Sequence, residues 1–214
     1  LSMTRPSQRL IVWSRAAGGV PEAIGDIAAA LVGCRVSTAY RGLVERGRLT
    51  ADETLCGHGC GGVGLAAVAL GRALGARVIA VDVDPAALTL ATALGADVAL
   101  DASVVDDVSA SVRDLGSAHV SIDCLGGAAV ASASIRSLRP LGRHVQVGLF
   151  PAATAELPIS LVVRDELELL GVHGQSASRF GPLFDLIASG RLDLAPLVTA
   201  EIGLADVPAA LPAM

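Results

Sequence analysis

The 214-residue sequence predicts an α/β protein, a doubly wound parallel sheet of six strands with helices on both faces. Three observations lead to this prediction. Short apolar runs alternate with alanine- and leucine-rich stretches of helical length, which is typical of parallel strand–helix–strand units. The chain is 52% hydrophobic, as strands covered on both faces require. A glycine-rich turn follows the first apolar run directly.

The six apolar runs are short enough to be single strands. They lie at Thr54–His58, Arg77–Asp82, Asp97–Leu100, His119–Asp123, His144–Leu149 and Glu168–Val172. The helical stretches between them are Gly62–Leu74, Pro85–Leu94, Val104–Leu115 and Ala128–Leu138. Pro85 suits a first helical turn, and Asp101 or Ser103 could cap the helix after the third strand. Residues 150–166, with two prolines, are expected to form a loop.

Helices are also expected at both ends of the chain. Residues 1–20 form a poorly specified lead-in, and residues 21–214 are predicted to be one Rossmann-type domain. Helical periodicity begins at Pro21, and a second helix is expected from about Arg35 to Glu45. After the last strand, helices are predicted at Ser176–Ser189 and Leu204–Met214.

The charge pattern argues against several classes of partner. All 16 basic residues are arginines, they are scattered, and 21 acids outnumber them, which disfavours nucleic-acid binding. The uncharged stretch around the glycine cluster, residues 55–71, is shorter than a membrane span, so we expect no membrane association. Four cysteines without a Cys-x-x-Cys pair or a secreted-type framework predict a cytoplasmic protein.

The glycine-rich turn has the Gly-x-Gly-x-x-Gly spacing of dinucleotide-binding proteins. Residues 59–64 read Gly-Cys-Gly-Gly-Val-Gly between the first strand and the first helix. Gly59 permits the tight turn, Gly61 lets the backbone approach a pyrophosphate, and Gly64 lets helix and strand pack closely. The free amides at the start of the helix supply the anion site.

Asp82 stands where such a fold needs an acid for the adenosine ribose. It ends the second strand 18 residues after Gly64, close to the spacing of about 20 that is expected. A carboxylate there accepts both ribose hydroxyls and repels a 2′-phosphate, and neither Val83 nor Asp84 supplies an arginine, so we predict NAD over NADP.

Two alternatives remain open at this point. The glycines could only shape a tight turn while Asp82 caps the next helix. A methyltransferase that uses S-adenosylmethionine has similar geometry, but it usually carries an acid two positions before the first glycine, where this chain has Gly57.

Three stretches of the sequence resemble the medium-chain, zinc-dependent alcohol dehydrogenases. They are Gly-Cys-Arg-Val-Ser-Thr-Ala-Tyr at 33–40, the glycine turn together with Val-Ile-Ala-Val-Asp at 78–82, and Val-Gln-Val-Gly-Leu at 145–149 followed by Leu-Gly-Val-His-Gly at 170–174. The likeness runs from about Pro21 to Met214. It implies an oxidoreductase that interconverts an alcohol and an aldehyde or ketone with NAD.

The resemblance also implies roles for individual residues. The cofactor-binding positions that match are Thr38, Gly59, Gly61, Gly62, Val63, Gly64, Asp82, Leu125, Val147 and Gly148. Gly61, Gly62 and Val63 would line the pyrophosphate and nicotinamide, Asp82 would hold the adenosine ribose, and Thr38, Val63, Leu125, Val147 and Gly148 would flank the nicotinamide and its ribose. Cys34 matches the third protein ligand of the catalytic zinc, which acts as a Lewis acid on the alcohol oxygen.

The sequence also departs from the family pattern. The GroES-like domain that supplies the other zinc ligands is expected before Pro21 and is absent here, and so is the cysteine-rich lobe of the structural zinc. Ala86 or Ala87 replaces a basic residue often found after the ribose acid. Because one ligand cannot make a tetrahedral site, we expect Cys34 to be a small buried side chain in this chain.

Two hypotheses about function therefore stand side by side. The chain is an incomplete alcohol dehydrogenase that uses NAD, or it is a non-catalytic dinucleotide-binding module. Its partners would be a small alcohol or carbonyl substrate and a second copy of the chain. Dimerisation is expected through the strand at Glu168–Val172, which lies at the edge of the sheet.

Overall fold

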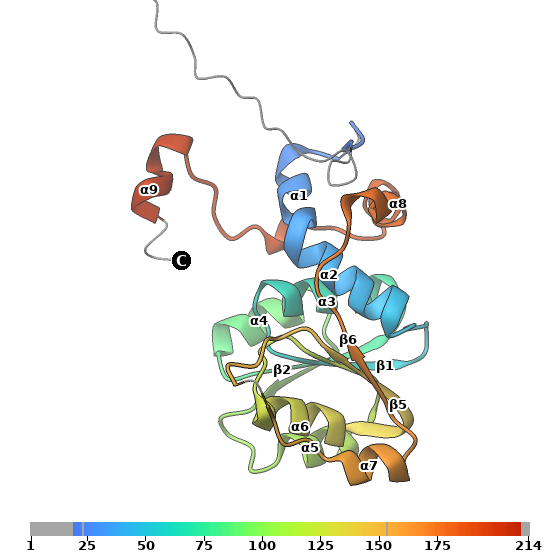
Figure 1. Ribbon diagram of the computed structural model, residues 1–214. Coiled ribbons are helices and arrows are strands. Elements are labelled where there is room, and N and C mark those ends of the chain that lie inside the picture. Colours follow the sequence, from blue (N-terminus) through green and yellow to red (C-terminus); the bar gives the residue numbers. More distant parts are fainter. Residues whose placement is uncertain (1–18, 23, 153, 211–214) are drawn as a thin grey trace, which may run out of the picture.

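A computed structural model describes residues 19–22, 24–152 and 154–210, and it confirms the predicted parallel sheet of six strands (Figure 1). The bounds predicted for the fifth strand, 144–149, were wrong, because this strand begins directly after the preceding helix and ends at Gln146. The strands are β1 (Thr54–His58), β2 (Arg77–Asp82), β3 (Val98–Asp101), β4 (Ala118–Asp123), β5 (Leu138–Gln146) and β6 (Glu168–Gly171). All are parallel, in the order β3-β2-β1-β4-β5-β6. The order of the strands reverses between β1 and β4, because β1 to β3 follow one another in one direction and β4 to β6 in the other. In sheets of this kind, ligands bind at this point, beyond the carboxyl ends of the strands.

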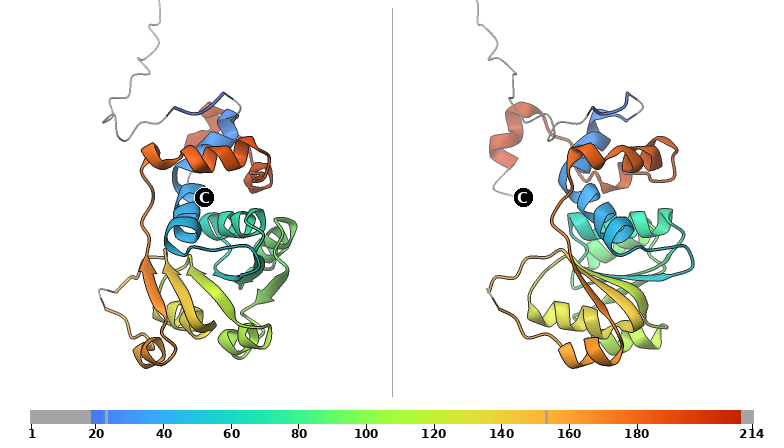
Figure 2. Two further views of the ribbon diagram at one scale, coloured as in Figure 1. Left: turned by 90° about the vertical axis from the view of Figure 1, so that its right-hand side faces the viewer. Right: turned by 45° about the vertical axis from the view of Figure 1, so that its right-hand side comes forward.

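Helices cover both faces of the sheet (Figures 1 and 2). One face carries α3 (Gly62–Ala73), α4 (Pro85–Ala93) and a long N-terminal helix, and the other carries α5 (Val108–Asp114), α6 (Ala128–Arg136) and α7 (Ile159–Arg164). Alternate residues of each strand enter opposite layers, as strand geometry requires. Leu55 of β1 joins the core under α3, whereas its neighbour Cys56 joins the second core.

The N-terminal helix differs from the prediction of two helices. It runs without a break over residues 26–46, as α1 (Asp26–Leu31), the π-helical η2 (Val32–Val36), α2 (Ser37–Tyr40) and the π-helical η3 (Arg41–Arg46). Its buried face continues through the supposed junction, so nothing in the packing favours a break there. By length and composition this helix could cross a bilayer, but core helices of soluble proteins pass the same test, and 44% of its most apolar window is buried here.

Two local predictions about the second layer were wrong. The helix after β3 begins at Val108 rather than at Val104, and its cap is Asp107, whose Oδ1 accepts a hydrogen bond from Ala110 N at 3.0 Å. Asp101 instead accepts hydrogen bonds from Ser103 in a turn. The expected loop at 150–166 contains α7, because apolar residues of this segment pack into the second core.

The C-terminal part brings its first α-helix beside the start of the long helix (Figure 2). Its elements are η4 (Ala177–Arg179), α8 (Gly181–Ala188), η5 (Ala195–Leu197), η6 (Leu204–Asp206) and α9 (Val207–Ala210). The helix predicted at 176–189 is thus shorter than expected, and the last four residues of the helix predicted at the C-terminus lie outside the described residues. So does almost all of the predicted lead-in, and the domain division at residue 20 stays a prediction.

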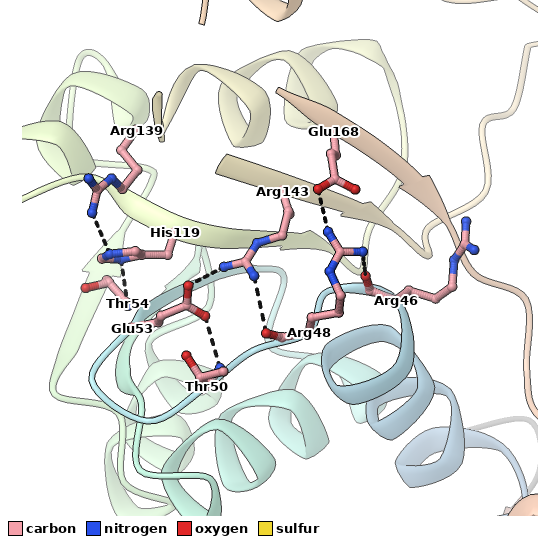
Figure 3. Close-up of polar contacts among 9 residues, drawn as sticks. All are labelled: Arg46, Arg48, Thr50, Glu53, Thr54, His119, Arg139, Arg143 and Glu168. Atoms are coloured by element: carbon pink, nitrogen blue, oxygen red, sulfur yellow. Dashed lines mark hydrogen bonds and ion pairs between the residues drawn. The ribbon is translucent and has the colours of Figure 1, made fainter. Parts of the chain in front are cut away.

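Charged side chains meet at the edge of the sheet where β1, β4 and β6 begin (Figure 3). Arg143 forms an ion pair with Glu53, and Arg48 forms one with Glu168. Glu53 also accepts a hydrogen bond from Thr50 N at 3.0 Å, and Arg143 donates one to Arg48 O at 3.2 Å. We call Arg48, Glu53, Arg143 and Glu168 the amino-edge network. Each of these charged side chains forms an ion pair with another member.

Candidate cofactor site

The glycine turn between β1 and α3 leaves backbone amides open to a ligand. Gly59 has a positive φ of +94°, and Gly59 N donates to Val81 O at 2.8 Å. A Cβ on Gly64 would lie 1.7 Å from Gly59 O, so only glycine fits there. A Cβ on Gly61 would meet nothing within 4 Å, and this residue caps α3 without a side chain. The N–H groups of residues 61–63 have no hydrogen-bond acceptor among the described residues, as an anion site needs.

Asp82 is fixed between the glycine turn and the turn after β2. Its Oδ2 accepts a hydrogen bond from Cys60 N at 2.5 Å, and its Oδ1 accepts from Val83 N at 2.7 Å and Asp84 N at 3.0 Å. The alternative in which Asp82 caps the next helix is wrong, because Asp84 is the cap of α4 and accepts from Ala86 N at 2.9 Å. The half-buried Asp82 carboxylate thus stands beside the first glycines of the turn.

A buried carboxylate joins the loops after β4 and β5. Asp123 has no exposed surface, and its Oδ1 accepts hydrogen bonds from Leu125 N at 2.9 Å and Gly126 N at 2.8 Å. Its Oδ2 accepts from Gln146 Nε2 at 3.0 Å, and the same amide nitrogen donates to Gly148 O at 2.8 Å. Gly148 N in turn donates to Asp123 O at 2.8 Å. Hydrogen bonds to Asp123 therefore fix both Leu125 and Gly148, two residues expected to flank the nicotinamide.

Asp123 and Gln146 are not among the site residues expected from the sequence. A signal for Asp123 was present, because this acid ends a strand just before the glycine pair at 126–127, much as Asp82 ends β2. Gln146 carried no such signal. It pairs with Asp123 only because β5 lies next to β4 in this register.

Two buried histidines, His58 of β1 and His144 of β5, lie in the sheet next to these polar residues. His144 Nε2 lies 3.0 Å from Gln146 Oε1, and its Nδ1 lies 3.2 Å from Ser121 Oγ and 3.1 Å from Ser134 Oγ. One tautomer satisfies all three contacts, with Nε2 donating and Nδ1 accepting. Burial lowers the pKa of His144, and it lowers the pKa of His58 to about 4. Both imidazoles are therefore neutral at pH 7, and His58 is the packed histidine that was predicted.

The residues expected around the nicotinamide do not all meet. Leu125 is 57% exposed, and its Cγ lies 2.5 Å from where a Cβ on Gly59 would stand, so its side chain covers the glycine turn. Val63 is half-buried at the start of α3. Val147 and Gly148 line a depression of about 500 Å³ together with His173 and other residues of the β5 and β6 loops. Thr38 is buried in α2, which packs against α3.

Cys34 is exposed, contrary to the expectation of a small buried side chain. Residues 33–35 are all exposed, between the buried Val32 and Val36 of the long helix. In the part of the chain that the structure describes, no three His, Cys, Asp or Glu residues come together as a metal site. A tetrahedral catalytic zinc needs three protein ligands, so the described residues do not fit a zinc site by themselves.

The other three cysteines are packing residues, as expected. Cys56 and Cys60 are buried and Cys124 is partly buried. Burial raises the pKa of the Cys56 and Cys60 thiols to about 12, so they are protonated at neutral pH and unreactive.

The sheet order and the glycine turn are those of a Rossmann-type domain. Residues 62–189 match the family described as zinc-binding dehydrogenase. This match spans more than half of the chain, and the chain belongs to that family, whose members include the medium-chain alcohol dehydrogenases.

Individual relatives support the same assignment. The chain is 31% identical over 173 residues to an erythritol/L-threitol dehydrogenase of Mycolicibacterium smegmatis, covering 76% of this chain and 46% of the relative. It is 30% identical over 202 residues to an alcohol dehydrogenase of Cupriavidus necator, covering 89% and 53%. The crystal structure of the alcohol dehydrogenase TADH from Thermus sp. ATN1 superimposes with a TM-score of 0.81 at 28% identity, covering 90% and 57%.

The chain spans about half the length of these relatives. The relatives are alcohol and polyol dehydrogenases, so they favour the dehydrogenase interpretation over the methyltransferase alternative.

Proposed function

We propose that this chain binds NAD and serves as the cofactor domain of an oxidoreductase of the alcohol dehydrogenase type. The observation that carries the proposal is the hydrogen bond from Cys60 N to Asp82 Oδ2, beside the open amides of α3. It supports the proposal because it holds Asp82, the acid proposed to bind the ribose, next to the turn proposed to bind the pyrophosphate. A dinucleotide can then place its diphosphate on the helix amides and its adenosine ribose on the carboxylate.

The chemistry around Asp82 supports NAD rather than NADP. A 2′-phosphate on the ribose would bring its negative charge close to the Asp82 carboxylate, which repels it. The next two residues, Val83 and Asp84, are exposed, and neither supplies a positive charge. Enzymes that accept NADP use an arginine near this place.

The reaction proposed for the whole protein is the interconversion of a small alcohol and its aldehyde or ketone. Bound NAD would accept the hydride from the substrate carbon. The part of this chain is to bind and orient the cofactor, with Asp82 and the α3 amides at the adenosine and pyrophosphate end. At the nicotinamide end, Leu125 and Gly148 would border the ring, and the hydrogen bonds to Asp123 would keep both residues in position. Cys34 is one candidate zinc ligand, and we assign no step to zinc.

A non-catalytic dinucleotide-binding module is the second candidate. It is favoured by the contrast between a complete cofactor turn and the lack of a metal cluster among the described residues. The two candidates differ in turnover. Oxidation of short alcohols and polyols, followed through NADH absorbance, would support the enzyme, whereas NAD binding without turnover would support the module.

Calorimetry on the full chain tests the cofactor assignment. We expect NAD and NADH to bind, and NADP to bind at least tenfold more weakly. Asp82→Asn removes the charge that holds the ribose hydroxyls, so it should weaken NAD binding by about tenfold, the order of one hydrogen bond to a charged group.

Asp114→Asn is the matched control, because this exposed acid lies on α5, on the opposite face of the sheet. It should leave binding unchanged. Well-folded protein that gives no heat with NAD or NADH, or that binds NADP as tightly, would refute the assignment.

We also propose a homodimer formed through β6. This strand is at the edge of the sheet, and its residue Leu169 is 38% exposed. An exposed edge strand offers unpaired backbone groups to a second copy. Light scattering at high concentration should show twice the chain mass of 21.5 kDa, and the mass of a monomer would refute the homodimer. We propose, too, that the protein is cytoplasmic and has no membrane or nucleic-acid partner.

A further inference from the structure

Arg35 reaches over the glycine turn from the long N-terminal helix. A Cβ on Gly62 would lie 2.6 Å from Arg35 Cδ and 2.7 Å from Arg35 Nε. The arginine stem therefore occupies the space that a side chain at position 62 would need. Gly62 is the first residue of α3, so the guanidinium of Arg35 lies beside the helix amides that have no acceptor among the described residues.

The Arg35 guanidinium has no protein partner within the described ranges. No ion pair or side-chain hydrogen bond involves it there, and the residue is exposed. Two other arginines that lie near the sheet are engaged with protein groups. Arg41, on the same helix, donates to Gly174 O at 2.8 Å, and Arg143 pairs with Glu53. Arg35 thus adds an unpaired positive charge to a helix terminus that already favours anions.

We propose that Arg35 binds the pyrophosphate of the dinucleotide, as a contact from outside the glycine turn. This inference rests on the proposed function, because it adds a residue to the same cofactor site. A guanidinium donates two parallel hydrogen bonds to phosphate oxygens, and such charge-assisted bonds are stronger than those of neutral donors. The cation and the α3 amides then hold the diphosphate from two sides.

The position of Arg35 assigns it to the diphosphate rather than to the ribose. It contacts Gly62, and with Gly61 and Leu65 it lines a small cavity of about 110 Å³. Asp82 contacts the other end of the turn, at Cys60, and it forms no ion pair with Arg35. The two charged side chains therefore serve different parts of the dinucleotide.

Binding of ligand fragments separates these roles. Arg35→Ala should weaken NAD and ADP-ribose by about tenfold in calorimetry, since it removes one charge-assisted contact to phosphate. Adenosine, which has no phosphate, should bind equally to both proteins in NMR titrations to millimolar concentration. The affinity of Arg35→Lys for these ligands should lie between those of Arg35→Ala and the unmodified chain, because an ammonium keeps the positive charge but cannot donate two parallel hydrogen bonds to a phosphate.

Arg46→Ala is the matched control. Arg46 lies on the same long helix, is exposed, and carries the same charge, but it stands at the far end, near the amino-edge network. This variant should bind all three ligands like the unmodified chain. The affinity of the Arg35→Ala variant for NAD should also fall less steeply with salt than that of the unmodified chain, because it has one phosphate contact fewer.

The outcomes distinguish the two proposals. Unchanged ADP-ribose affinity in Arg35→Ala, or an equal loss in Arg46→Ala, would overturn the role of Arg35 and leave NAD binding intact. An equal loss of adenosine binding would overturn it too, because that result would mean a general disturbance of the site. Failure of the unmodified chain to bind NAD would refute the proposed function itself.

Discussion

The two edges of this sheet use polar residues in opposite ways. At the amino edge, Arg143 and Glu53 pair with each other, and their side chains are only 13% and 19% exposed. At the carboxyl edge, Asp82 and Asp123 bind backbone amides, while the first amides of α3 and the guanidinium of Arg35 have no partner among the described residues. Folded proteins satisfy nearly all their buried polar groups, so groups left open at an accessible turn are the ones a ligand can use.

This contrast separates stability from binding. A change at the amino edge should alter the free energy of unfolding and leave cofactor affinity alone. A change at the glycine turn should affect cofactor affinity, and it should affect stability only where the new atoms meet the backbone. Each of the following variants could break this division.

Gly64→Ala should have the largest effect. Its Cβ would lie 1.7 Å from Gly59 O, a backbone atom that cannot move without displacing the turn. We expect a loss of several kcal/mol in the free energy of unfolding, in the range of severe substitutions, together with the loss of NAD binding. Urea denaturation and calorimetry measure the two effects.

Gly61→Ala is the matched comparison in the same turn. Its Cβ would meet nothing within 4 Å, and its backbone φ of −74° suits alanine. Stability should therefore change by less than about 1 kcal/mol, while NAD affinity falls at least tenfold because the methyl group enters the space of the diphosphate. An equal loss of stability in both variants would contradict this account of the turn.

Glu53→Gln should have a smaller effect, confined to stability. It removes the negative charge beside Arg143 and leaves that guanidinium without its ion pair, so we expect a loss of about 1–3 kcal/mol at pH 7. NAD affinity should not change, because Glu53 precedes β1 and the glycine turn follows it, at the opposite end of the strand. A weaker NAD affinity in this variant would break the division between the two edges.

The effect of Glu53 should also depend on pH. Burial alone would raise the pKa of Glu53, but the hydrogen bond from Thr50 N and the Arg143 guanidinium outweigh it and hold the pKa below its ordinary value. A carboxyl with a lowered pKa stabilises the fold above its unfolded pKa, and this contribution is lost as the pH falls through the folded pKa. The stability difference between Glu53→Gln and the unmodified chain should therefore shrink in acid.

Glu168→Gln serves as the control for this prediction. Glu168 pairs with Arg48 in the same network, but both side chains are about half exposed, and such pairs contribute under about 1 kcal/mol.

Prediction from the sequence worked best where the signal was local. The bounds of β1 and β2 agree with the sequence analysis, and the glycine turn joins them to α3 as its spacing indicated. It was less reliable where packing decided the outcome. The long helix continues across Gly33 because a buried face runs along it, and α7 forms because its apolar side reaches the second core.

The sequence alone determined the glycine turn that we propose to hold a dinucleotide and the acid that follows it, because strand, glycines and Asp82 lie within one strand–helix–strand unit. Only the tertiary structure decided what surrounds that unit. It set Arg35 over Gly62, Gln146 against Asp123 and Arg143 against Glu53. These pairs are distant along the chain, and they meet because of the order of the strands and the docking of the long helix, which no local pattern of residues encodes.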